Sequence, residues 1–344
     1  MLQVLKSIQF LRFIAATLVV FTHSMDNAKY NISDSTTPTM HYVSHFGKSG
    51  VHIFFVISGF IMIYTSFGGS AQFDSSKFFL RRLIRIYPIY WIYAAAYILL
   101  REIVSGGYQS IWAVFGSLLL IPGYSSIIIG QGWTLSYEVY FYICFSFFMM
   151  LGLFSGLLVM TLFFLASIAV GLIFHFDNSG LHVFTDSLLV EFLFGAWIAY
   201  FFILDKRLSS SLSNALIVLA LALFVISIPL GYNRLPTVLT WGVPSALLIA
   251  GSVFKERGGN LPSFVRRCSF LGDSSYSLYL LHILLTALLL RGFLAIFPSP
   301  ESGYFVFCLV LTGLCIAISA VMYELIERRV VRALQTMIGK FQGS

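Results

Sequence analysis

Two ionisable side chains interrupt the first apolar run of the chain, and their types suit acid–base chemistry. Arg12 and His23 are eleven residues apart in the stretch IQFLRFIAATLVVFTH. A helix places them on one face, separated by roughly 16 Å along its axis, so they cannot share a hydrogen bond. An imidazole can act as a general base near neutral pH, whereas a guanidinium stays charged. The alternatives are an arginine that snorkels to the lipid headgroups and a structural histidine at the membrane interface.

A carboxylate occurs in a second stretch, GWTLSYEVYFY, which carries Glu138. We expect this side chain about a turn and a half inside the outer membrane surface, where an acid needs a partner or a role. Glu138 would share the outer half of the membrane with His23, and it could orient the imidazole and stabilise its charged form. It could equally form a buried ion pair or a structural hydrogen bond.

A pair of arginines follows in KFFLRRLIRIYPIYW, where Arg82 and Arg85 are three residues apart. This spacing places both on one helix face, which we expect at the cytoplasmic boundary. Guanidinium groups match phosphate oxygens in geometry, so the pair could clamp a phosphate. The general excess of basic residues on the cytoplasmic side of membrane proteins is the alternative, and spacing alone favours it.

Two further stretches combine small or aromatic residues with polar groups. GKSGVHIFFVISGF has Ser58 and Gly59 in mid-span, where small residues allow close helix contact. SYSLYLLH, at the expected cytoplasmic start of a later helix, places Tyr276, Tyr279 and His282 on one face. For the tyrosines, an aromatic belt at the membrane interface is the alternative to a site.

The amino-acid composition indicates that most of the chain is surrounded by lipid. Hydrophobic residues make up 58% of the 344 residues and charged residues only 10%, whereas soluble domains carry about 25% charged residues. The net charge of +7 comes from short basic clusters between apolar runs, which favours membrane topology over nucleic-acid binding. The four cysteines show neither CxxC nor Cys/His metal spacing, so we predict no disulfide and no metal site.

The apolar runs predict an all-α membrane protein with about ten transmembrane helices in one domain, residues 1–344. No internal repeat, no low-complexity linker and no cleavable signal peptide is evident. A spanning helix needs about 20 apolar residues. The predicted spans are 7–25, 50–67, 87–104, 133–152, 155–175, 188–204, 214–231, 236–254, 276–297 and 303–325.

The distribution of basic residues orients these spans. With both termini in the cytoplasm, fifteen of the 21 Lys and Arg residues lie on the inner side and four on the outer side. This bias predicts an N-in and C-in topology. The basic, amphipathic tail RRVVRALQTMIGKF is expected to lie on the inner membrane surface against anionic lipid.

Taken together, five ordered motifs resemble the acyltransferase-3 family of integral membrane acyltransferases, and most closely its bacterial exopolysaccharide O-acetyltransferases. The motifs are R-x10-H, GVxxFFVISGF, RRxxRIxPxYW, WTLxxExxFY and SYSLYLLH, and they extend from one end of the chain to the other. One departure is His52, which stands where the family usually has Asp. The role of that acid is therefore in question in this chain.

The resemblance implies transfer of an acyl group, commonly acetyl from cytoplasmic acetyl-CoA, to a hydroxyl of a cell-surface or exopolysaccharide sugar. It implies a multi-pass protein of the bacterial inner membrane. Acetyl-CoA would be a donor substrate, and no cofactor would be bound permanently. The expected partners are an acyl-CoA donor, a polysaccharide or lipid-linked saccharide acceptor and membrane lipid, with no nucleic acid.

The resemblance maps the family's essential arginine–histidine pair onto Arg12 and His23, its arginine motif onto Arg82 and Arg85, and its acid onto Glu138. The chemical roles of these residues are our own hypothesis. We expect His23 to be the general base, Glu138 its orienting group, and Arg12 to line the path of the pantetheine arm. An acyl-histidine intermediate is a competing mechanism. The predicted site comprises catalytic His23, Arg12 and Glu138, donor-binding Arg82 and Arg85, and substrate-binding Trp133, Tyr137, Ser58 and His282.

Two other classes of protein share some of these features. A transporter or flippase for lipid-linked saccharides would also have about ten helices and a polar stripe, but it would not need to bind CoA. A structural or assembly protein of a polysaccharide export complex would tolerate changes at His23 without loss of product acetylation.

Overall fold

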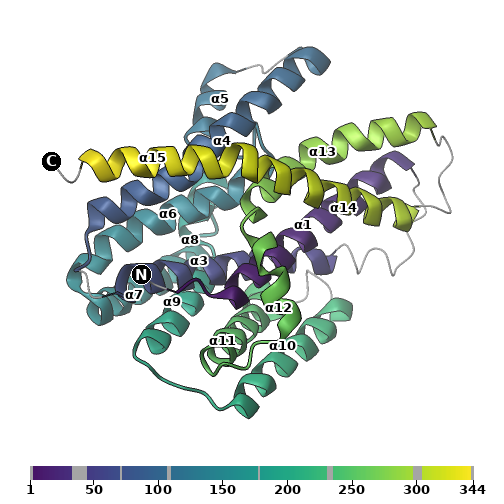
Figure 1. The fold of residues 1–344 in the computed structure, drawn as a ribbon. Coiled ribbons are helices and arrows are strands. Elements are labelled where there is room, and N and C mark those ends of the chain that lie inside the picture. The colour runs from purple at the N-terminus through teal and green to yellow at the C-terminus, as the bar shows by residue number, and fades with distance from the viewer. Residues whose placement is uncertain are drawn as a thin grey trace.

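The computed structural model describes residues 3–32, 45–69, 72–106, 110–176, 179–230, 235–296 and 304–341. Within these ranges all regular secondary structure is helical (Figure 1). The helices are α1 (Lys6–Ile32), α3 (Ser49–Phe67), α4 (Ser75–Ser105), α5 (Ile111–Leu118), α6 (Gly132–Phe148), α7 (Leu153–Phe174), α8 (Ser179–Thr185), α9 (Leu189–Ile203), α10 (Ser210–Leu230), α11 (Val243–Arg257), α12 (Ser263–Cys268), α13 (Ser275–Ile296), α14 (Tyr304–Met322) and α15 (Arg328–Phe341).

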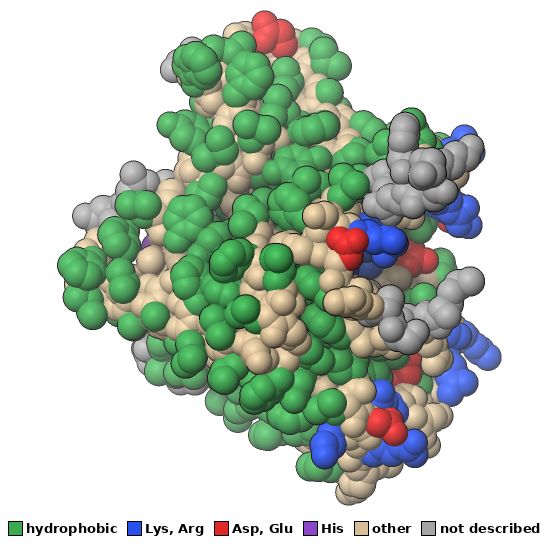
Figure 2. Space-filling view, turned by 90° about the vertical axis from the view of Figure 1, so that its left-hand side faces the viewer, with side chains coloured by type: hydrophobic (Ala, Val, Ile, Leu, Met, Phe, Trp, Pro, Cys, Tyr) green, Lys and Arg blue, Asp and Glu red, His purple; other side chains and the backbone are tan. Residues whose placement is uncertain are grey.

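The all-α prediction is confirmed. In the described ranges, nine helical stretches are long and apolar enough to cross a membrane, and they match nine of the ten predicted spans. The remaining span, 276–297, coincides with α13, in which the apolar stretch found is the shorter Ser275–Leu289. Figure 2 shows hydrophobic side chains over most of one face, with Lys and Arg gathered along a single edge. The N-in and C-in orientation stays a prediction.

The start of α4 differs from the predicted boundary. The helix begins at Ser75, where the side chain of Asp74 accepts a hydrogen bond from the backbone nitrogen of Lys77. Arg82 and Arg85 therefore lie within the helix, about two to three turns from its start. The prediction placed the boundary after the basic cluster, because charge suggested the edge of the membrane, whereas the Asp74 cap sets the start of the helix.

The basic tail forms a continuation of the last span. A π-helical segment, Tyr323–Glu327, joins α14 to α15, so both run as one long helix with a local change of winding. α15 packs against α4 and crosses the molecule at the front of the view in Figure 1. This contact places the C-terminal helix beside the helix that carries Arg82 and Arg85.

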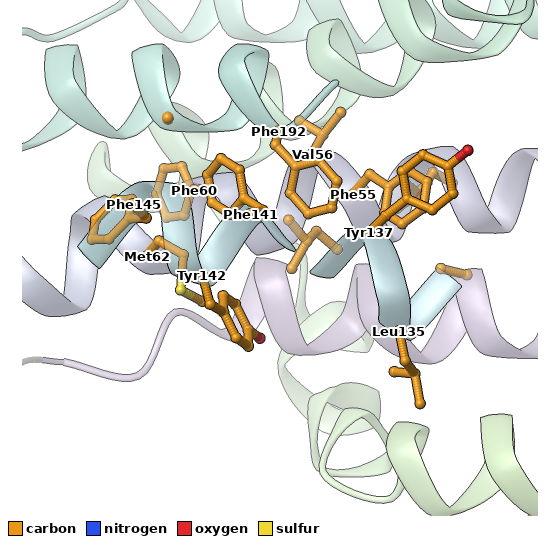
Figure 3. Close-up of a cluster of buried hydrophobic side chains, with 14 of the residues drawn as sticks. Phe55, Val56, Phe60, Met62, Leu135, Tyr137, Phe141, Tyr142, Phe145 and Phe192 are labelled. Atoms are coloured by element: carbon orange, nitrogen blue, oxygen red, sulfur yellow. The ribbon is translucent and has the colours of Figure 1, made fainter. Parts of the chain in front are cut away.

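The contact between α3 and α9 is very close because glycines face the opposite backbone. A Cβ added at Gly59 would lie 1.9 Å from the carbonyl oxygen of Phe192, and one at Gly195 would lie 1.8 Å from that of Val56. Aromatic rings fill the space beside this crossing, with Phe141 and Phe192 stacked at 4.5 Å (Figure 3). The packing interpretation of Gly59 is thus confirmed.

The same helix pair encloses an ionisable pair. His52 Nδ1 lies 2.5 Å from Glu191 Oε1, and both side chains are buried. Gly242 packs closely against this carboxylate. A Cβ added at Gly242 would lie 2.7 Å from Glu191 Oε1. Position 52, where the resemblance leads one to expect an acid, therefore carries a histidine that has an acid as its partner on α9.

Replacing Gly195 with Val should separate α3 from α9. The added side chain meets backbone rather than a flexible group, so we expect a clear fall in the thermal unfolding temperature of the detergent-solubilised protein. Gly313→Ala is the control, because nothing lies within 4 Å of its Cβ position and alanine favours a helix. Equal unfolding temperatures for the two variants would contradict this close contact.

Replacing His52 with Ala should leave Glu191 buried without a partner. Breaking a buried pair in this way costs about 3–5 kcal/mol, whereas replacing both partners by apolar residues is often neutral. We therefore expect His52→Leu combined with Glu191→Leu to be more stable than His52→Ala in the same thermal assay. A double variant no more stable than the single one would argue against the pair.

Candidate active site

A cavity lies between α1, α3, α4, α6 and α13, with an empty volume of about 770 Å³ that includes its open part. Five of the residues predicted for the site line it together. They come from four helices that are distant in sequence, and they are Arg12, Ser58, Arg82, Arg85 and Glu138. The structure thus brings the predicted donor-binding arginines next to Arg12 and the predicted acid.

Arg12 is held in this cavity by a chain of hydrogen bonds. The residue is only 8% exposed, and its Nη1 donates to Gln9 Oε1 at 3.0 Å. Gln9 Nε2 in turn donates to Asp273 Oδ1 at 2.5 Å. Burial raises the pKa of the Asp273 carboxyl, while the charges of Arg12 and Arg85 act in the opposite direction. Arg12 is therefore anchored within the bundle rather than extended to the headgroups.

The α4 arginines reach the cavity from its opposite wall. Arg82 Nη2 donates to Thr65 Oγ1 at 2.7 Å, near the end of α3. Its guanidinium also lies 5.3 Å from the centroid of the Phe78 ring and 6.0 Å from that of Tyr142, within the range of cation–π attraction. Arg85 follows one turn later and lines the same space. Three guanidinium groups thus converge on one cavity.

Glu138 is engaged by neighbours on α3 and α6. Ser58 Oγ donates to Glu138 Oε1 at 3.2 Å, and the hydroxyl of Tyr142 donates to the same oxygen. In Figure 3 the Tyr142 ring points away from the aromatic cluster around Phe141. Among the described residues, no hydrogen bond joins Glu138 to His23, and His23 is not part of the cavity lining. The contact by which Glu138 was expected to orient the His23 ring is therefore not formed.

His23 instead lies beside another predicted residue, His282. Their ring centroids are 5.2 Å apart, with an angle of 31° between the planes. His282 is the last residue of the motif SYSLYLLH, which was expected at the start of its helix, and α13 does begin at Ser275. The backbone at Gly272, just before α13, packs against Gln9 near the start of α1, and from there the two helices run in contact as far as the rings of His23 and His282.

The protonation of His282 follows from its neighbours. The residue is fully buried, its Nδ1 lies 3.2 Å from the carbonyl oxygen of Leu278, and its Nε2 lies 3.0 Å from Gln131 Nε2. A carbonyl requires a donor, so Nδ1 carries the hydrogen. Nε2 then accepts a hydrogen bond from the amide of Gln131. His282 is thus a neutral ring held in one tautomer beside His23.

Two residues connect this histidine pair to the cavity. The hydroxyl groups of Thr134 and Tyr279 are 2.8 Å apart, and both residues line the cavity. Thr134 also donates to the backbone oxygen of Gln131 at 2.9 Å, while the Tyr279 and His282 rings are 6.0 Å apart. The histidine pair therefore adjoins the cavity at a distance from the arginines.

Trp133 and Tyr137 face another side of α6. Their rings contact each other at 5.9 Å, and Trp133 is 39% exposed. The Tyr137 hydroxyl donates to Asp186 Oδ2 at 2.6 Å, in the segment between α8 and α9. Neither residue lines the cavity. The structure does not bring these two predicted substrate-binding residues into the same space as Arg12.

Several residues of the site were missed by the sequence reasoning. Thr134 and Tyr142 lie within the motif WTLxxExxFY, and Gln131 lies just before it. Neutral polar residues at these positions look ordinary in a sequence. Hydrogen bonds across helices, to Tyr279 and His282, reveal Thr134 and Gln131. Tyr142 lies four residues after Glu138 on α6, and this helical spacing is the signal that could have found it.

Comparison with known proteins identifies the family of this chain. Residues 5–324 match the family described as "Acyltransferase domain", which is the acyltransferase-3 family. The chain is 32% identical over 301 residues to "Exopolysaccharide production protein ExoZ" of Rhizobium meliloti (strain 1021), covering 83% of this chain and 90% of that protein. No solved structure matches the chain. This multi-pass membrane protein therefore belongs to the acyltransferase-3 family.

Proposed function

We propose that this protein transfers an acetyl group from acetyl-CoA to a hydroxyl of a cell-surface or exopolysaccharide sugar. The observation that carries the proposal is the cavity itself, in which Arg12, Arg82 and Arg85 converge while the His23–His282 pair adjoins it. The similarity to an exopolysaccharide production protein supports a saccharide acceptor. Membership of an acyltransferase family supports the class of reaction.

The arginines suit the phosphate groups of CoA. Guanidinium groups donate paired hydrogen bonds to phosphate oxygens, and they remain charged when partly buried. The expected cytoplasmic position of Arg82 and Arg85 fits a donor that arrives from that side. Glu138 offsets one of the three positive charges, so the cavity keeps a positive balance for an anionic ligand. Arg12 would contact the donor deeper in the bundle.

His23 is the proposed general base. Its imidazole would take the proton of the acceptor hydroxyl as the oxygen attacks the thioester carbonyl carbon. The new C–O ester bond forms, the C–S bond breaks, and the leaving thiolate takes up a proton to give free CoA. The neutral His282 ring beside it places no second positive charge against the protonated base. A His23 acyl intermediate is the competing route.

Arg82→Ala and Arg85→Ala should each weaken CoA binding. A hydrogen bond to a charged group contributes about 1.5–3 kcal/mol, so we expect the Kd for CoA to rise roughly 10- to 100-fold, as measured by calorimetry on purified protein. Arg81→Ala is the matched control, because Arg81 is exposed and does not line the cavity. Absence of CoA binding to the wild type, as for a saccharide flippase, would refute the donor site.

His23→Ala should separate donor binding from chemistry. Loss of a general base lowers the rate by about 10²- to 10⁴-fold, so we expect normal CoA affinity with little transfer. The measurements are thiol release and mass spectrometry of the acetylated polysaccharide. His175→Asn is the control, since this exposed histidine ends α7 with a positive φ that asparagine tolerates. Normal acetylation by His23→Ala would exclude His23 as the base.

A further inference from the structure

An unpaired polar atom belongs to the residue that contacts His282, the ring beside His23. Gln131, the residue before α6, is 3% exposed, and its Nε2 contacts His282 Nε2 at 3.0 Å. Its Oε1 is buried and has no hydrogen-bond partner among the described residues. A buried carbonyl oxygen without a donor is unfavourable, because it has lost its hydrogen bonds to water. The Gln131 side chain is held in place by His282, so its Oε1 is a hydrogen-bond acceptor that lacks a donor.

The orientation of this amide is set by its neighbour. His282 Nδ1 faces the backbone oxygen of Leu278, so Nε2 has a lone pair and no hydrogen in the neutral ring. A reversed amide would place Gln131 Oε1 against that lone pair. The alternative is a charged imidazolium in a fully buried position, which is costly. The amide nitrogen of Gln131 therefore donates to His282 Nε2, and Oε1 is left as an acceptor for a ligand.

The missing donor must be compatible with His23. A hydroxyl has only one hydrogen, so the reacting hydroxyl cannot donate to His23 and to Gln131 Oε1 at the same time. A second donor is needed close to the first one. Sugars carry hydroxyl groups on neighbouring carbons, and an adjacent hydroxyl meets this requirement. A simple alcohol does not.

We propose that Gln131 is an acceptor-binding residue whose Oε1 accepts a hydrogen bond from a hydroxyl next to the one that is acylated. This inference rests on the proposed acyl transfer to sugars. Gln131 then has two functions on one amide, because its nitrogen holds His282 beside the base and its oxygen orients the acceptor. The protein would select vicinal diols, of which saccharides are the biological form, over isolated hydroxyls.

The test compares acceptors that differ by one hydroxyl. Purified full-length protein is given acetyl-CoA with 1,2-propanediol or 1-propanol, and with deacetylated exopolysaccharide from the source strain. For the wild type we expect kcat/KM to be about tenfold higher for the diol than for the alcohol. Gln131→Met, which keeps the side-chain length and removes both polar atoms, should abolish this preference and raise the KM for polysaccharide. Its Kd for CoA should stay unchanged.

Two further variants distinguish binding from a structural role. Gln131→Glu keeps an oxygen for the hydroxyl but loses the amide donor to His282, so it should retain the preference for the diol with a lower kcat. Ser213→Ala removes another buried, unpaired polar atom in α10, and it should behave as the wild type in every assay. Unchanged diol preference and KM in Gln131→Met, or a fall in kcat alone, would overturn the inference while the proposed function stands. A wild type that binds acetyl-CoA but acylates no acceptor would overturn both.

Discussion

The structure depends on the cost of placing charged groups inside an apolar bundle. A guanidinium in such surroundings needs hydrogen-bond acceptors or an opposite charge within reach. The chain from Arg12 through Gln9 to Asp273 meets this need across the interface between α1 and the segment that precedes α13. The bond from Arg82 to Thr65 does the same between α4 and α3. The arginines are thus fixed in position by helices that are remote in sequence.

Because of this constraint, the arginines and the histidine pair lie at two separate places along the same helix bundle. α1 carries Arg12 at the cavity and His23 about 16 Å further along its axis. The residues that join the two ends are neutral, namely Thr134 and Tyr279, which share a hydrogen bond. A long, flexible donor can extend between such ends without a large movement of the protein. The arrangement therefore fits the proposed division into donor binding at one end and acyl transfer at the other.

The surroundings of the histidine pair contrast with those of the arginines. No carboxylate hydrogen-bonds to either ring among the described residues, and burial disfavours a charge on His282, whose Nε2 accepts a hydrogen bond from the amide of Gln131. A neutral ring beside the proposed base avoids repulsion when the base becomes charged. Elsewhere the chain does pair a buried histidine with an acid, at His52 and Glu191. That second pair lies within the close crossing of α3 and α9, where a structural role is expected.

The sequence by itself determined the helices and the faces of single helices, because both follow from local periodicity and apolar length. It placed Arg12 and His23 on one face of α1, and Arg82 next to Arg85 on α4. Contacts between helices depend on how distant segments cross, so only the tertiary structure decided them. His52 meets Glu191 across 139 residues of chain, and Gln131 meets His282 across 151. The contact of Glu138 with Ser58 likewise depends on the crossing of α6 with α3, whereas its contact with Tyr142, four residues later on α6, follows from helix periodicity.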